Sequence, residues 1–85
     1  MSYWFNASVE FKNNCEYPEG IVKKEISKLN IKGMGTRVEG DIVYIVQQDP
    51  DYLQCFELIK NLKSNHLVCM IHISSLHCET LSTHK

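Results

Sequence analysis

Histidines and cysteines near the C-terminus are the residues of this sequence with the clearest potential for metal chemistry. His66, Cys69 and His72 recur at intervals of three, and His77-Cys78 follows shortly after. Imidazole and thiolate groups are the usual zinc ligands. The surrounding segment alternates as a strand does, so His66 and His72 are expected on one face and Cys69 on the other. The sequence therefore predicts no metal site and no cofactor.

Two cysteines could act as nucleophiles if a base stood beside them. Cys15 lies in a polar loop and Cys78 lies in the C-terminal segment. Only Cys78 has a neighbouring base, His77, and adjacent residues on an extended chain point apart. The acidic pair Asp49 and Asp51 is explained by helix capping. We therefore predict that the protein is not an enzyme.

Apolar periodicity and turn residues predict six elements in the order strand, helix, strand, strand, helix, strand. The strands are expected at 3–11, 34–38, 42–46 and 66–74, and the helices after Pro18 and after Asp49. The run 42–46 is unbroken and apolar, which indicates a strand buried on both faces. The Gly40-Asp41 turn joins it to the strand before it.

The helices are expected to bury one stripe each. Val22, Ile26 and Leu29 form the stripe of the first helix. In the second helix, Asp49 is predicted to cap, Pro50 to take the first helical position, and one stripe to face the core. That stripe consists of Tyr52, Cys55, Phe56, Ile59 and Leu62.

This element order predicts a particular architecture. Two β-α-β halves with right-handed crossovers give an α+β, ferredoxin-like βαββαβ sandwich. Its four-stranded antiparallel sheet carries both helices on one face. Residues 1–74 are expected to form the single domain, and residues 75–85 a polar C-terminal tail or an extension of the sheet edge.

The bulk composition argues against several partners. The chain has 85 residues and a formal net charge of −1, so it lacks the basic surface of a nucleic-acid binder. No apolar run approaches the length of a membrane span, and the start lacks a secretory signal pattern. The four cysteines show no metal-finger or redox spacing and are expected to be reduced thiols. We therefore expect a cytoplasmic protein with no nucleic-acid and no membrane partner.

One face of such a sheet carries no helix, and this open face is where we expect the function. The first strand should place Trp4, Asn6, Ser8 and Glu10 there, and the last strand His66, Val68, Met70 and His72. The third strand adds either Ile42, Tyr44 and Val46 or Val43 and Ile45, and the apolar pattern fits both. Either choice puts large apolar groups in water, which forgoes ~1.5–3 kcal/mol for each side chain that could be buried.

A contiguous apolar patch of this kind usually marks an interface. We therefore predict a non-catalytic protein-binding module of the inhibitor, immunity or adaptor type. The partner is another protein or, in a homodimer, a second copy. The alternative is that the C-terminal tail folds over the open face. The predicted partner-binding residues are Trp4, Asn6, Glu10, Tyr44, Val68, Met70 and His72.

Other proteins with this element order offer alternative functions. ACT-like regulatory domains bind amino acids near the first strand–helix loop, where Asn13 and Asn14 could supply polar contacts, although the usual glycine is missing. A small-ligand sensor is therefore the alternative function. Acylphosphatases cradle phosphate with glycines and an arginine in this loop, and residues 12–16 contain neither. RNA-recognition motifs need aromatic and basic residues in the third strand, whereas residues 41–46 contain one aromatic and no basic residue.

Overall fold

Six elements follow one another in the predicted order and build one four-stranded sheet. The computed structural model describes residues 3–78 of the chain. Of the predicted tail 75–85, residues 75–78 belong to the last strand, and residues 79–85 lie outside the described residues. The elements are β1 (Tyr3–Phe11), α1 (Pro18–Lys28), β2 (Met34–Glu39), β3 (Ile42–Gln48), α2 (Tyr52–Lys63) and β4 (Val68–Cys78). The sheet order is β2-β3-β1-β4, with every neighbouring pair antiparallel.

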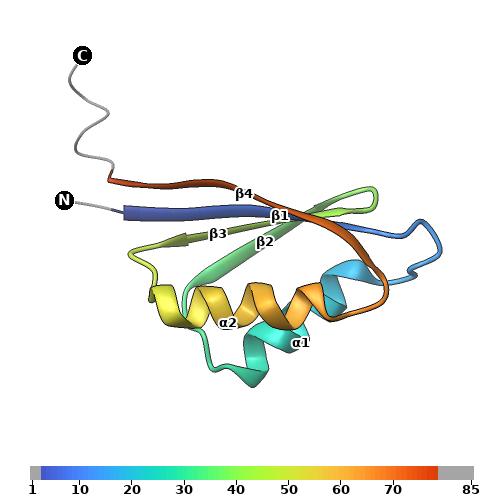
Figure 1. Cartoon of the computed structure of the whole chain (residues 1–85), viewed down its shortest axis with the longest axis horizontal. Coiled ribbons are helices and arrows are strands. Elements are labelled where there is room, and N and C mark those ends of the chain that lie inside the picture. Colours follow the sequence, from blue (N-terminus) through green and yellow to red (C-terminus); the bar gives the residue numbers. More distant parts are fainter. Residues whose placement is uncertain (1–2, 79–85) are drawn as a thin grey trace, which may run out of the picture.

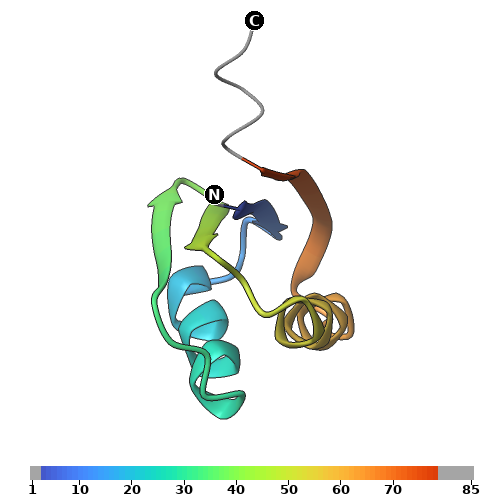
Figure 2. The ribbon, with the colours of Figure 1, turned by 90° about the vertical axis from the view of Figure 1, so that its left-hand side faces the viewer.

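Both helices pack on the same face of this sheet, α1 on the β2 side and α2 below β4 (Figures 1 and 2). The predicted α+β, ferredoxin-like βαββαβ fold is therefore confirmed. No helix within residues 3–78 is long and apolar enough to cross a lipid bilayer.

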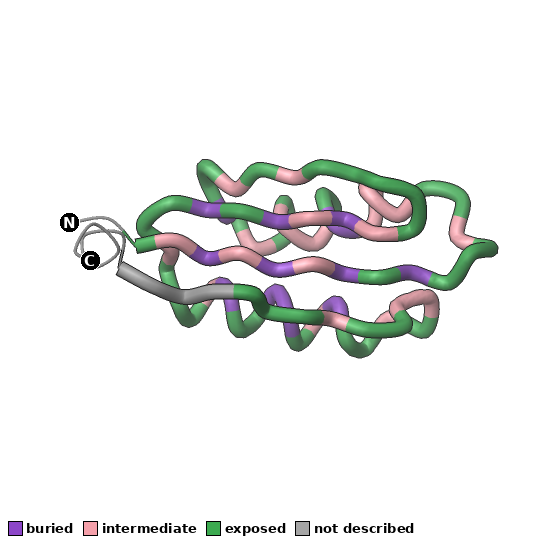
Figure 3. Tube along the Cα trace, turned by 90° about the horizontal axis from the view of Figure 1, so that it is seen from above, coloured by how far each residue is buried: buried purple, intermediate pink, exposed green. Residues whose placement is uncertain are grey.

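The core lies between the two central strands and the helices. Along β1 and β3, buried residues alternate with less buried ones (Figure 3). The fully buried large side chains are Phe5, Val9, Phe11, Val22, Val43, Ile45, Cys55, Leu58 and Leu62. The prediction that strand 42–46 is buried on both faces is wrong. Val43 and Ile45 are buried, whereas Val46 remains 38% exposed, because no helix covers the second face.

The β2–β3 hairpin fixes which side chains share that second face. Gly40 adopts a positive φ of 60°, which the short turn requires and a glycine tolerates. The register then pairs Glu39 with Ile42 and Arg37 with Tyr44. Directly paired residues in an antiparallel ladder point to the same face. Ile42 and Tyr44 therefore lie on the open face together with the two charged residues of β2.

The N-terminus of α2 differs from the prediction. Asp51, not Asp49, caps the helix, and its Oδ1 accepts hydrogen bonds from the backbone N–H groups of Leu53 at 3.0 Å and Gln54 at 3.2 Å. Asp49 instead adopts a positive φ of 52°, and its Oδ1 accepts a hydrogen bond of 3.3 Å from the backbone N–H of Tyr3. Its N–H donates to the Tyr3 carbonyl at 2.7 Å, so Asp49 closes the β1–β3 ladder.

The predicted apolar stripe of α2 is correct only in part. Its members at 55, 59 and 62 are buried, but Tyr52 is 43% and Phe56 58% exposed, and Leu58 is buried in their place. A hydrogen bond from the Gln54 Nε2 to the Leu29 carbonyl, 3.0 Å long, ties the other side of α2 to the end of α1. This contact turns Phe56 outward, away from α1.

Candidate functional site: the open face of the sheet

The face of the sheet without helices, here called the open face, is placed by the register of three strands. Glu10 lies between Ile42 and Met70, and Ser8 lies between Tyr44 and His72. Asn6 pairs with Val46, and Trp4 pairs with Gln48. The hairpin register therefore settles the choice that the apolar pattern left open, because Ile42, Tyr44 and Val46 face outward.

The apolar part of the open face is a single row along β3. Ile42 and Tyr44 are half-buried, and Val46 is exposed. Trp4 lies at the end of this row, one position beyond the Asn6–Val46 pair on the same face. We call these four side chains, Trp4, Ile42, Tyr44 and Val46, the apolar row.

Met70 does not join the apolar row. It is 61% exposed and is separated from Ile42 by Glu10, which pairs with both. Glu10 and Trp4 are six positions apart on β1, or ~20 Å along an extended strand. Trp4 and Met70, two of the predicted partner-binding residues, therefore lie at opposite ends of the face.

Polar side chains border the apolar row on both sides. On β1 and β4 the border is formed by Asn6, Ser8, Glu10 and His72. The open face is therefore less apolar than predicted, because only β3 presents a run of large apolar groups.

On β2 the border is formed by two charged side chains, Arg37 and Glu39, and Arg37 contacts the aromatic ring of Tyr44. The Arg37 guanidinium lies over the Tyr44 ring, 4.5 Å from its centroid, and also pairs with the Glu39 carboxylate. Such an exposed cation–π contact contributes ~0.5–1 kcal/mol. It holds the Tyr44 ring in place within the apolar row. An apolar centre with a polar, charged border is the usual composition of a protein interface.

A shallow hollow of about 440 Å³ lies within this face, and Gly35 accounts for it. Its lining includes Asn6, Arg37, Tyr44 and Val46. A Cβ built at Gly35 would meet only Val46, 3.5 Å from its side chain and 3.9 Å from its carbonyl. The missing side chain of Gly35 thus leaves space for an apolar group of another molecule.

The placement of Val68 on the open face is wrong. The β1–β4 register shifts twice, leaving Cys69 and Ser74 without a direct partner, so Val68 pairs with Phe11. It packs partly buried against the core. A bulge inserts one residue into the strand, so the residues before it point to the opposite face of the sheet from the one that strict alternation predicts. The alternation in 66–74 does not reveal such a bulge. The strand also continues to Cys78, beyond the predicted end at Ser74.

The described thiols offer no nucleophile with an adjacent base. Burial, with the nearby charge of Asp51, raises the pKa of the Cys55 thiol to about 11. Its Sγ lies 3.7 Å from the buried Gln47 Oε1, to which it donates a weak hydrogen bond. Cys15 and Cys69 are also free thiols. Among the side chains that the structure describes, no three of His, Cys, Asp or Glu could hold a metal ion together; those of His77 and Cys78 are outside this set.

A second hollow lies at the loop after β1, the region for which a small-ligand site was the predicted alternative. It measures about 520 Å³ and includes Asn14, Cys15, Tyr17 and Lys24 in the loop after β1 and the start of α1. The Tyr17 ring fills the space above Gly20, where a Cβ would come within 2.4 Å of it. Asn14 and Lys24 are exposed, so this hollow lacks buried polar groups that would orient a small molecule.

Comparison of the chain with family models, curated proteins and solved structures gives no match.

Proposed function

We propose that this protein is a non-catalytic binding module that docks another protein on its open face. The observation that carries the proposal is the apolar row, which runs along a central strand on a face that no helix covers. A docked partner would remove these side chains from water, each contributing ~1.5–3 kcal/mol if fully buried. The apolar row is bordered by charged and hydrogen-bonding groups. The partner must therefore present an apolar surface to the row and polar or charged groups to its border.

The geometry also supports a partner of particular chemistry. The hollow beside Gly35 accepts an aliphatic or aromatic side chain. Arg37 lines this hollow and pairs with Glu39, so a cation and an anion lie next to each other on this side of the face. A protein that acts by occupying a surface in this way would be an inhibitor, an immunity protein or an adaptor. We place it in the cytoplasm, and the free thiols of Cys15, Cys55 and Cys69 support a reducing compartment.

The test compares one variant on the open face with a matched control elsewhere. Val46→Glu places a charge in the apolar row at an exposed site, so the fold should be retained. Leu53→Glu makes the same change on α2, at a side chain that is 79% exposed. The immobilised wild-type chain and both variants are incubated with an extract of the source cells. A protein retained in stoichiometric amount is then purified and titrated against each by calorimetry.

We expect wild type and Leu53→Glu to bind alike and Val46→Glu to lose at least about tenfold in affinity, as for a substitution in the centre of an interface. Filling the hollow by Gly35→Leu should weaken binding similarly. Equal affinities of all four proteins for the retained protein would rule out the open face as the docking surface, and so would the absence of any stoichiometric partner.

The second candidate function is a small-ligand-sensing, ACT-like regulatory domain. It is supported by the position of the hollow at the loop after β1 and not by the polarity of its lining. A thermal-shift screen against amino acids and other metabolites separates the two functions. A large, specific stabilisation that is lost in Lys24→Ala and kept in Val46→Glu would favour the sensor. The protein-binding module predicts no such stabilisation.

A further inference from the structure

The outer edge of β4 is a second surface with unused binding capacity. β4 is the last strand in the sheet order, pairs on one side with β1, and ends the sheet within residues 3–78 (Figures 2 and 3). An edge strand presents a row of backbone N–H and C=O groups on its outer side, which another strand can pair with. The eleven residues Val68–Cys78 contain no Asp, Glu, Lys, Arg or Pro. The usual side chains that discourage edge pairing are therefore absent.

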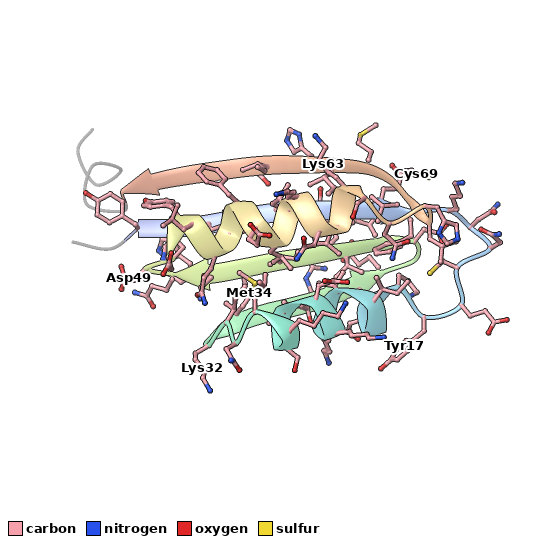
Figure 4. The ribbon with its side chains drawn as sticks, turned by 60° about the horizontal axis from the view of Figure 1, so that its bottom comes forward. Tyr17, Lys32, Met34, Asp49, Lys63 and Cys69 are labelled. Carbon is pink, nitrogen blue, oxygen red and sulfur yellow. The ribbon has the colours of Figure 1, made fainter. Side chains whose placement is uncertain are left out.

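The flank of α2 below this edge is apolar. Tyr52, Phe56, Ile59 and Lys63 follow at helical spacing on one side of α2. Tyr52, Phe56 and Lys63 are exposed, whereas Ile59 lies at the border of the core and is only 9% exposed. This side is opposite Gln54, which bonds toward α1, so it faces outward below β4. Lys63 and Cys69 lie on this side of the molecule (Figure 4). Phe56, Ile59 and Lys63 line a hollow of about 470 Å³ here.

We propose that a second copy of this chain occupies this side, with the two β4 strands pairing antiparallel about a two-fold axis. Such an axis, perpendicular to the sheet, gives one eight-stranded sheet with all helices on the same face. Only a β-strand satisfies the edge backbone groups, and β4 meets its own copy without like charges in contact.

The α2 flank is self-complementary under the same symmetry. When two copies of α2 pack antiparallel, Phe56 meets Ile59 of the other copy, and Tyr52 meets Lys63. The first contact covers the exposed Phe56 ring with the small part of Ile59 that the core leaves accessible. The second places an ammonium group beside a ring face. In both pairs the two residue numbers add up to the same value, which is the condition for contacts between antiparallel helices related by one two-fold axis. All four contacts therefore form around the same axis.

The two bulges of β4 locate the pairing segment. Cys69 and Ser74 interrupt the register with β1, and bulges discourage regular pairing. The stretch Met70–Ile73 between them is regular. Strand pairing should therefore be centred on these residues. The open face stays accessible in this dimer, so this proposal is independent of the proposed function.

Sedimentation equilibrium of the full-length chain, in the presence of reductant, tests the proposal. Ile73→Lys adds a charge on β4 at a side chain that is 40% exposed on the helix-covered side of the sheet. Its matched control is Val38→Lys on β2, also 40% exposed and on the same side of the sheet. Phe56→Lys and Leu53→Lys form a second pair on α2, where exposed positions keep the fold intact.

We expect a wild-type dimer that is weakened at least about tenfold by Ile73→Lys and by Phe56→Lys. Val38→Lys and Leu53→Lys should dimerise as wild type does, and so should Val46→Glu on the open face. A wild-type monomer at all concentrations overturns the proposal. So does a dimer that Val46→Glu weakens while Phe56→Lys does not, because that result places the contact on the open face.

Discussion

The two edges of the sheet differ in length and in charge. β2 has six residues, among them Gly35, Arg37 and Glu39, and its two charged side chains pair with each other. β4 has eleven residues and no formally charged one. Short length and charge are the features by which natural proteins prevent edge strands from pairing. One edge of this sheet has both features and the other has neither.

This difference indicates that the β4 edge is available for pairing and the β2 edge is not. The helices reinforce the contrast, because the α2 flank below β4 exposes Tyr52 and Phe56. By contrast, Thr36 on β2 donates a hydrogen bond of 2.8 Å to Glu19 of α1. Apolar groups thus accompany the unprotected edge, and polar contacts accompany the protected one.

The largest expected effect is on the free energy of unfolding, which should depend more on side chains in the centre of the sheet than on those at the β4 edge. Ile45→Ala should lower the free energy of unfolding by about 2–5 kcal/mol, because Ile45 is fully buried. In dilute solution Ile73→Ala should cost less than about 1.5 kcal/mol, because that side chain already contacts water. Denaturant titration at several protein concentrations measures both. At high protein concentration the loss of unfolding free energy caused by Ile73→Ala should increase. If Ile73→Ala and Ile45→Ala lower the free energy of unfolding equally in dilute solution, the assignment of β4 as a weakly packed edge is wrong.

A smaller effect distinguishes the buried side of α2 from its exposed flank. The pKa of the Cys55 thiol rises from 9.0 to about 11 on folding. Below pH 9 the thiol is protonated in both states, and its full contribution to stability is present. Between pH 9 and 11 only the unfolded state loses the proton, so the free energy of unfolding should fall by up to ~2 kcal/mol.

Denaturant titrations of wild type and Cys55→Val across this pH range measure that fall. The two proteins should differ in slope above pH 9, since the valine variant lacks the titrating group. Parallel pH profiles would show that the Cys55 thiol of α2 is not buried against β3. Cys69, which is exposed on β4, should react with iodoacetamide in the folded protein, whereas Cys55 should react only after unfolding.

The smallest effect comes from removing the charges of the β2 edge. The double variant Arg37→Thr, Glu39→Thr deletes the protecting pair and keeps residues with high strand propensity. We expect it to associate beyond the dimer, with a weight-average mass that rises with concentration, while wild type stops at two copies. If the double variant and wild type reach the same maximum weight-average mass, these charges do not protect the edge.

The sequence predicted the fold correctly because its local signals agree. The alternation in 3–11, the Gly40-Asp41 turn and Pro18 at the start of α1 all favour the same element order. The sequence also contained enough information to predict which residues of β3 lie on the open face. Arg37 and Glu39 must contact water, and a two-residue turn pairs them with Tyr44 and Ile42.

The remaining errors arise where a pattern fits two arrangements. Val68 and Cys69 are both apolar enough for either face, so the bulge at Cys69 leaves no sign in the alternation. In α2 the apolar positions spread over more than half of the helix surface. Packing against α1, through the Gln54–Leu29 contact, decides that Leu58 is buried and Phe56 exposed.

Amide hydrogen exchange at high and low protein concentration tests the unequal edges most directly. We predict that the outward-facing amides in Met70–Ile73 exchange slowly when the protein is concentrated and rapidly when it is dilute, because pairing with a second copy protects them. The outward-facing amides of β2 should exchange rapidly at both concentrations. Exchange in β4 that does not change with concentration, or concentration-dependent protection in β2, would contradict the account.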